Sequence, residues 1–251
     1  MGQWVKWSDP EIHQFDRYFK SLISQLTLYQ KIRDINPNRS YDSISREIRR
    51  MRADGRAPTK EAAIKTLRVG YLDIEASGLD ADFHFILSWY IKARERDYYD
   101  SAVITKKEIF DLQFDKRLVI ELLKSLDNYD VIYTHWGVDR RFDIPFIRTR
   151  AYWHGLQDLL PRNAEKFILD TWPIAKQKLR LHSNRLDSIA ECLGIDNVKK
   201  TPLKPRLWVM ASAGDAKSLE QIALHNKRDV QLLERVHRKL EIIERPKYYS
   251  I

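Results

Sequence analysis

The segment Tyr71-Leu72-Asp73-Ile74-Glu75 reads as a short apolar β-strand that carries two carboxylates one residue apart. Residues i and i+2 of a strand point to the same face of a sheet, so Asp73 and Glu75 are expected to project together. Two like charges held this close are costly unless a cation neutralises them. Oxygen ligands of this kind suit Mg²⁺ or Mn²⁺. The segment therefore predicts a divalent metal site on a buried strand.

Two later segments supply further acidic candidates. Arg141-Phe142-Asp143-Ile144-Pro145-Phe146 contains Asp143, and His225-Asn226-Lys227-Arg228-Asp229 contains Asp229. With the first pair they make four carboxylates in an order that predicts a two-metal site for phosphodiester cleavage. Simpler interpretations stay open: Asp143 opens a predicted helix and could serve as its N-cap, and Asp229 could form an ordinary salt bridge with Arg228.

The pattern around these motifs predicts an α/β fold, a mixed β-sheet flanked by helices. Three strands come first and suggest a β-meander, and shorter strands then alternate with helices. The strands are expected at 67–74, 83–93, 97–104, 130–134 and 167–171, and the helices at 115–125, 143–152, 186–193 and 219–241.

The first 55 residues have a different pattern, typical of three short helices, the third rich in arginine. Residues 1–66 contain 13 Lys and Arg against eight Asp and Glu. The segment loosely resembles a Myb/SANT-type helix-turn-helix module, which would place Arg46, Arg49 and Arg50 on nucleic acid. The alternative is a three-helix cap with a solvated basic face. We expect a helical module at 1–55, a linker at 56–66 and the main domain at 67–251.

The composition limits the class of protein. The chain has 251 residues, a net charge of +9 and a pI of about 9.5, which favours a polyanionic partner such as nucleic acid. Its one cysteine, Cys192, excludes a disulfide framework within the chain and a cysteine-rich zinc site; we expect it to be a small core residue. No stretch is apolar enough to span a membrane, so we expect a soluble, cytoplasmic protein.

Over residues 67–241 the chain resembles the DEDD (DnaQ-like) 3′–5′ exonuclease superfamily, which has the ribonuclease H-like fold. The resemblance rests on motifs in one order: Asp73-Ile74-Glu75 with Ser77-Gly78-Leu79, Tyr133-Thr134-His135-Trp136-Gly137 with Phe142-Asp143, Leu186 to Ile195, and His225 to Val230. It implies that Asp73 bridges two metal ions, that Glu75 and Asp229 complete one metal site, and that Asp143 holds the second ion, through water.

Two positions depart from the family pattern. Family members have Tyr four residues, or His five residues, before the last Asp, whereas His225 stands four residues before Asp229. Residues i and i+4 share a helix face, so His225 could accept a proton from the attacking water; alternatively it is a surface or capping residue. Trp136 could stack on a base or belong to the core, and Arg140 and Arg141 could contact phosphates.

The resulting prediction is a metal-dependent 3′–5′ exonuclease that uses two divalent cations, Mg²⁺ or Mn²⁺. It would act on a single-stranded or frayed 3′ end, with DNA slightly favoured over RNA. The N-terminal module could add contact with duplex DNA, and a proofreading role would need a separate polymerase. The alternatives are an endonuclease or structure-specific ribonuclease on the same fold, or a nucleic-acid-binding protein whose nuclease domain is inactive.

Overall fold

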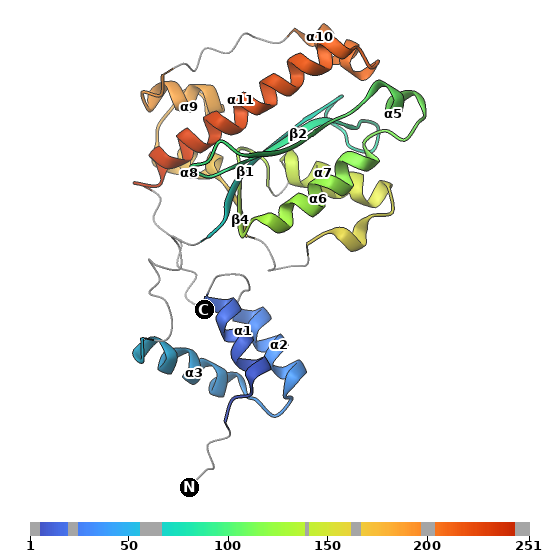
Figure 1. The fold of residues 1–251 in the computed structure, drawn as a ribbon. Helices are drawn as coiled ribbons and strands as arrows, with labels where there is room; N and C mark the ends of the chain where they lie inside the picture. Colours follow the sequence, from blue (N-terminus) through green and yellow to red (C-terminus); the bar gives the residue numbers. More distant parts are fainter. Residues whose placement is uncertain are drawn as a thin grey trace. The chain divides into compact units, whose positions relative to one another are not determined.

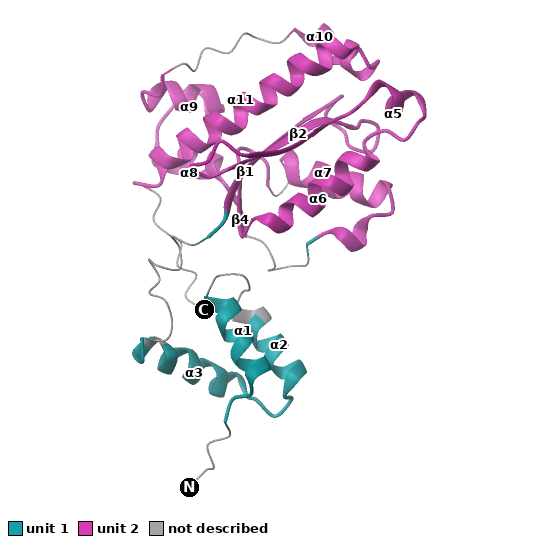
Figure 2. Cartoon of the chain, viewed as in Figure 1, with its two compact units in different colours: residues 1–68, 161–167 teal, residues 69–160, 168–251 magenta. Residues whose placement is uncertain are grey.

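The computed structural model describes residues 6–19, 25–55, 67–138, 141–161, 167–196 and 204–243. The chain divides into two compact units, residues 1–68 with 161–167 and residues 69–160 with 168–251 (Figure 2). The linker predicted at 56–66 lies outside the described residues, so its limits stay a prediction.

The first unit contains three described helices, as its apolar spacing predicts. They are α1 (Asp9–Phe19), α2 (Gln25–Ile35) and α3 (Tyr41–Ala53). Side chains at helical spacing turn inward and form a small core of their own, and its buried members are Phe15, Phe19, Leu28, Ile32, Ile44, Ile48 and Met51. The helix-turn-helix identity stays a prediction.

A buried ion pair holds the start of α1. The Ser8 backbone N–H and hydroxyl both donate to Glu11 Oε2 at 2.8 Å, so the Glu11 carboxylate satisfies a backbone donor at the start of the helix. Arg39 Nε donates to Glu11 Oε1 at 2.7 Å, and its guanidinium lies 3.7 Å from the centroid of the Trp7 ring. Burial alone would raise the pKa of Glu11, but the hydrogen bonds from Arg39 and Ser8 outweigh it and lower the pKa to about 2.

The second unit is built on a five-stranded sheet in the order β3-β2-β1-β4-β5. Strand β1 pairs antiparallel with β2 and parallel with β4, so the sheet is mixed, as predicted. The parallel pairing extends only from Val69 to Tyr71. The strands are β1 (Val69–Ala76), β2 (Ile86–Ala93), β3 (Tyr99–Val103), β4 (Val131–Thr134) and β5 (Phe167–Asp170).

Helices cover both faces of this sheet (Figure 1). The long helix α11 (Ala216–Leu240) crosses one face, while α6 (Lys116–Ser125) and α7 (Asp143–Trp153) lie on the other. Leu72 and Ile74 of β1 are buried in the core shared with α6 and α7. Because side chains alternate along a strand, the odd-numbered residues of β1 face α11.

A buried charged cluster fixes the start of α6 to α7. Asp115 is fully buried and accepts hydrogen bonds from Arg150 Nη2 at 2.7 Å and from the Ile86 backbone N–H at 2.8 Å. His154 Nε2 lies 2.7 Å from the same carboxylate. Burial raises the pKa of Asp115, but the bonds from His154 and Arg150 outweigh it and lower the pKa. Removing one partner would leave an uncompensated buried charge, so the cluster holds α7 in place.

The structure differs from the sequence predictions at several points. Cys192 is exposed, so its predicted place in the core is wrong. Strand β2 begins at Ile86 rather than 83, and Phe83 is exposed. None of the described helices is long and apolar enough to cross a membrane. The remaining helices are α5 (Lys106–Phe110), η1 (Leu126–Asn128), η2 (Gln157–Leu159), α8 (Thr171–Lys178), α9 (Leu186–Cys192) and α10 (Pro205–Ser212), of which only α9 was predicted.

Candidate metal centre

Strand β1 and helix α11 bring three ionisable side chains together. His225 Nε2 lies 3.8 Å from Glu75 Oε1 and 3.8 Å from Asp229 Oδ2. One ligand atom from each of the three residues lies within 4.8 Å of the other two. All three side chains are half-buried, so they are reachable from solvent yet partly shielded from it. The i, i+4 spacing on α11 does place His225 and Asp229 on one helix face.

Asp73 lies two residues before Glu75 on β1 and is half-buried like it. Its partner across the antiparallel pair is Tyr90, and that of Glu75 is Ser88. Both carboxylates therefore leave the same face of the sheet, the face that α11 crosses. The predicted pairing of these two carboxylates on one face follows directly from the strand register.

Asp143 contacts strand β1 through the backbone of Ile74. It is the first residue of α7 and is 3% exposed. The Ile74 backbone N–H, between Asp73 and Glu75 in sequence, donates to the Asp143 carboxylate. The N-cap of α7 is Phe142, so Asp143 is not the N-cap that the alternative interpretation suggested.

The buried position of Asp143 makes its charge costly. Burial raises its pKa to about 8, and the negative charge of Asp170 adds to this, against the effect of the Ile74 hydrogen bond. Near neutral pH the folded chain therefore favours the protonated form of Asp143 unless a cation lies close by.

Gly137 provides the room that the Asp143 carboxylate occupies. A Cβ built on Gly137 would overlap Asp143 Oδ2 and would lie 2.7 Å from Thr134 Cβ. The turn after β4 therefore packs its bare backbone against the acidic side chain. A larger residue would not fit at position 137, which explains physically why a glycine follows Trp136. The sequence pattern alone gave no such reason.

Sequence reasoning missed Asp170, which organises this turn. Asp170 ends β5, is 6% exposed, and accepts hydrogen bonds from the backbone N–H groups of Trp136 and Gly137 at 2.9 and 3.0 Å. Arg141 Nη1 also donates to it at 2.7 Å. An acidic residue at a strand end beside a helix start was the available signal.

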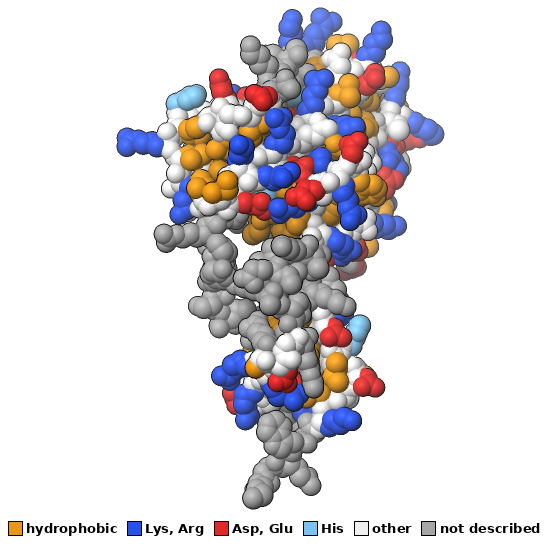
Figure 3. Space-filling view, turned by 60° about the vertical axis from the view of Figure 1, so that its left-hand side comes forward, with side chains coloured by type: hydrophobic (Ala, Val, Ile, Leu, Met, Phe, Trp, Pro, Cys, Tyr) orange, Lys and Arg blue, Asp and Glu red, His pale blue; other side chains and the backbone are white. Residues whose placement is uncertain are grey.

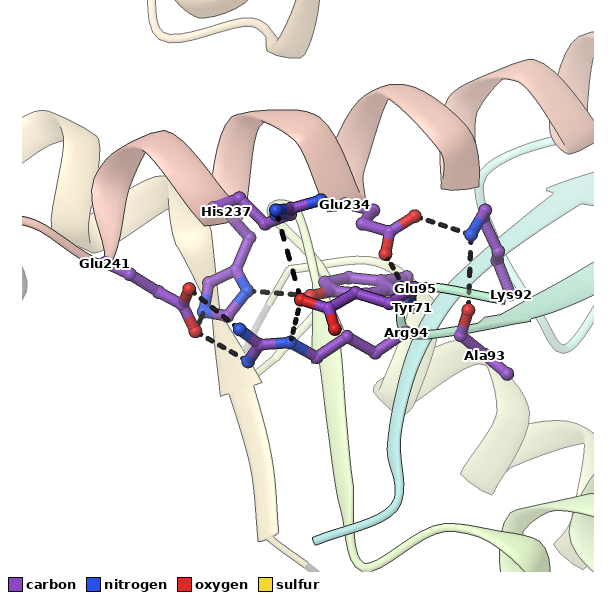
Figure 4. A network of polar contacts seen from close by, with 9 residues as sticks. Tyr71, Lys92, Ala93, Arg94, Glu95, Glu234, His237 and Glu241 are labelled. Atoms are coloured by element: carbon purple, nitrogen blue, oxygen red, sulfur yellow. Dashed lines mark hydrogen bonds and ion pairs between the residues drawn. The ribbon is translucent and has the colours of Figure 1, made fainter. Parts of the chain in front are cut away.

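Contacts along α11 set its register on the sheet. Near the carboxylates, Asn226 Nδ2 donates to the Ser88 backbone oxygen at 3.2 Å and lies 3.1 Å from its hydroxyl. Towards the far end, the Tyr71 hydroxyl lies 2.9 Å from His237 Nδ1. Figure 4 shows this second network, in which Arg94 also binds Glu241. A helix held at two points cannot slide, so its acidic face stays opposite β1.

The residues predicted to contact nucleic acid differ in their ion-pair partners. Trp136 is 48% exposed, with φ of 62°, so it is not a core tryptophan. Arg46 forms an exposed ion pair with Asp42, whereas Arg50 pairs with Glu47, which is buried; Arg49 is exposed. Arg140 lies outside the described residues. In Figure 3, Lys and Arg side chains are spread over the visible face of both units, with acidic side chains among them.

The donor set fits a hard divalent cation. Carboxylate oxygens suit Mg²⁺ and Mn²⁺, and an imidazole nitrogen is also acceptable to Mn²⁺. Glu75 and Asp229 lie close together around His225, and burial raises the pKa of Asp143. A bound cation would stabilise the charged forms of these carboxylates. His225 can chemically serve either as a ligand or as a proton acceptor.

Comparisons with known proteins agree with this architecture. A family model for the RNase_H superfamily matches residues 70–241, a range that contains all four carboxylates and His225. A DNA polymerase of Methanocaldococcus jannaschii is 28% identical over an alignment of 126 residues, and the match covers 41% of this chain and 8% of the polymerase. The chain thus spans a small part of that relative. Since the family model covers well over half of the sequence and the fold agrees with it, the chain belongs to the RNase_H superfamily.

Proposed function

We propose that this protein is a metal-dependent 3′–5′ exonuclease that hydrolyses the terminal phosphodiester bond of a single-stranded or frayed nucleic acid. The observation that carries the proposal is the approach of Glu75, His225 and Asp229 to within 4.8 Å of one another, beside a strand that also presents Asp73 and contacts Asp143. Members of the superfamily are typically phosphodiester hydrolases, which agrees with this chemistry.

The four carboxylates are the groups that would hold two divalent ions. Glu75 and Asp229 would share one ion with Asp73, and Asp143 would hold the other with Asp73. When bound, such ions lower the pKa of water and neutralise charge on the phosphate and the leaving oxygen.

His225 would act on the attacking water. Its Nε2 faces Glu75 and Asp229 at 3.8 Å, so the imidazole is oriented toward the carboxylates that would surround the water. In hydrolysis the water oxygen bonds to phosphorus, the bond to the 3′-oxygen of the preceding nucleotide breaks, and a nucleoside monophosphate leaves. His225 Nε2 would take the proton that the water releases.

Two features support nucleic acid as the substrate and slightly favour DNA. The relative with 28% identity is a DNA polymerase, and a proofreading partner for this chain would be a separate polymerase. Trp136 offers an exposed aromatic face on which a base could stack. A 2′-hydroxyl would be read by details of the pocket, so RNA is the natural competitor in an assay.

The three-helix unit would add affinity, including for duplex DNA. Arg46 holds Asp42 in an exposed ion pair. Such pairs contribute little stability, so a phosphate could replace Asp42, whereas the Glu47 partner of Arg50 is buried. We expect Arg49→Ala to weaken nucleic-acid binding and to reduce the slope of log affinity against log salt by about 1. A fluorescence-anisotropy titration across salt concentrations measures both, and an unchanged slope would contradict this role.

The proposed activity is tested by incubating 5′-labelled single-stranded DNA and RNA with the protein and Mg²⁺ or Mn²⁺, with EDTA, and with Asp73→Ala. We expect a ladder that shortens from the 3′ end, that needs the metal and that Asp73→Ala abolishes. A 3′-blocked strand and a circular strand are the matched controls.

Two results would favour the rivals. Cleavage of the circular strand would indicate an endonuclease or a structure-specific ribonuclease. Tight binding without any metal-dependent cleavage would indicate a nucleic-acid-binding protein with an inactive nuclease domain.

A further inference from the structure

Asp170 is a buried carboxylate to which the proposed chemistry assigns no part. It lies at the junction of β5 and α8, where its Oδ1 accepts a hydrogen bond from the Trp172 backbone N–H at 2.8 Å and caps that helix. One such bond satisfies an N-cap. Asp170 receives four more hydrogen bonds from a different part of the chain, so capping alone does not explain its surroundings.

The other donors come from the turn between β4 and α7. Three successive backbone N–H groups point into the carboxylate: Trp136 donates to Oδ1 at 2.9 Å, and Gly137 and Val138 donate to Oδ2 at 3.0 and 3.3 Å. The fifth donor is Arg141 Nη1, at 2.7 Å from Oδ2. Such a concave array of backbone N–H groups binds an anion, and here the anion is a side chain of the protein itself.

This array determines the shape of the turn. Trp136 has φ of 62°, a left-handed conformation that is strained for a residue with a Cβ. The Asp170 carboxylate offsets this strain, because in this shape three consecutive N–H groups converge on its two oxygens. Trp136 also accepts a bond from the Phe142 backbone N–H at 3.2 Å, and Gly137 accepts one from Ile144 at 2.8 Å. These two bonds continue the turn into the start of α7.

The same turn forms one wall of the Asp143 site. Gly137 packs directly against Asp143 Oδ2. If the turn moves, the Asp143 carboxylate loses this packing partner and can move as well. Arg141, two residues before Asp143, ties the segment to Asp170 from the other end, and its guanidinium is 4.5 Å from the Trp172 ring centroid. Both ends of the loop that leads to Asp143 are therefore bound to one acidic residue.

We propose that Asp170, together with Arg141, is a positioning residue that holds the Asp143 carboxylate where it can take its share of a divalent ion. This rests on the proposed function, because that function makes Asp143 a metal ligand. It also gives Arg141 a structural task, while the phosphate contact predicted from the sequence stays a prediction.

The test uses an isosteric change. Asp170→Asn keeps the size of the side chain but replaces one acceptor oxygen by an NH₂ donor. Whichever way the amide is turned, this donor faces N–H groups that need an acceptor, since both carboxylate oxygens receive at least two hydrogen bonds. Asp158→Asn is the matched control, because Asp158 is an exposed carboxylate of the same unit.

The main measurement is Mn²⁺ binding to the full chain, followed by electron paramagnetic resonance of the free ion. We expect wild type and Asp158→Asn to bind two ions, and Asp170→Asn to bind one of them about 10–100-fold more weakly.

A second variant covers the case in which Asp170→Asn does not fold, as judged by its circular dichroism melt. Arg141→Gln removes one of the five donors at a half-buried side chain, and Arg141→Lys restores a donor. Weakened Mn²⁺ binding in Arg141→Gln, recovered in part by Arg141→Lys, supports the proposal.

The outcomes separate this inference from the proposed function. Unchanged Mn²⁺ binding in folded Asp170→Asn, or in Arg141→Gln if Asp170→Asn does not fold, would overturn the positioning role and leave the nuclease proposal intact. A wild type that binds two ions but cleaves nothing would overturn the nuclease proposal alone. A wild type that binds no Mn²⁺ would overturn both.

Discussion

The substitution Gly137→Ala tests whether the position of Asp143 matters for activity. The added Cβ would lie 2.7 Å from Thr134 Cβ and would overlap Asp143 Oδ2, whereas carbon atoms in contact are normally about 3.5–4.0 Å apart. Asp143 and the turn must therefore separate by about 1 Å. Gly137 does not have a positive φ, so the backbone itself accepts alanine, and the effect is purely steric.

We expect turnover to fall by about 10²-fold, the usual cost of a 1 Å misplacement in a catalytic site. Overpacking should also lower the free energy of unfolding by about 1–3 kcal/mol. The assay is the initial rate of 3′ shortening at saturating Mg²⁺ and substrate, alongside a urea denaturation curve for the same preparation.

Gly155→Ala is the matched control, because Gly155 follows the C-terminal end of α7, the helix that Asp143 begins. Its φ is +68°, and an added Cβ there would have no neighbour within 4 Å. Alanine should therefore lower stability by about 1–2 kcal/mol through backbone strain while turnover stays within about twofold of wild type. If Gly137→Ala also kept turnover within about twofold, the position of Asp143 would not limit catalysis and the reasoning would be refuted.

Two further predictions concern His225 and the N-terminal unit. We expect His225→Gln to reduce turnover by about 10²–10⁴-fold and to leave Mn²⁺ binding unchanged. The control Arg228→Gln, on the same helix, should keep normal turnover. Weaker Mn²⁺ binding in His225→Gln would make the histidine a metal ligand, and normal turnover in that variant would remove it from the mechanism. The pKa of Glu11 is lowered to about 2 in the folded chain, so its ion pair stabilises the unit above the ordinary pKa of about 4.5, and this contribution is lost as pH falls from about 4.5 to about 2. Amide hydrogen exchange of the three helices should show this loss in wild type but not in Glu11→Gln, and an equal pH dependence in both would contradict it.

The features that the sequence could predict depend on local periodicity. The i, i+2 spacing of Asp73 and Glu75 was enough to place them on one face of β1, and the i, i+4 spacing of His225 and Asp229 was enough for α11. Both rules hold for any strand or helix, so the outcome needed no tertiary information. The mixed sheet flanked by helices followed from the order of the same elements.

The features that the sequence could not predict depend on contacts between distant segments. Asp170 looked like an unremarkable strand end, because its donors at 136–138 and Arg141 come from about thirty residues earlier in the chain. The short helices α8 and α10 were not predicted, although Pro173 and Pro205 lie in their first turns, where proline is tolerated. Cys192 was expected in the core from its residue type alone, and the last turn of α9 exposes it.

The central claim, that the acidic residues of β1, α7 and α11 form one catalytic metal centre, is tested most directly by a matched pair on α11. Asp229→Asn removes a charge from the inward face of the helix, and Glu220→Gln removes a charge from an exposed position of the same helix. The measurement is the rate at which 5′-labelled single-stranded DNA shortens from its 3′ end with Mg²⁺. The account predicts that Asp229→Asn loses this metal-dependent shortening while Glu220→Gln retains it. Equal rates in the two variants would contradict the account.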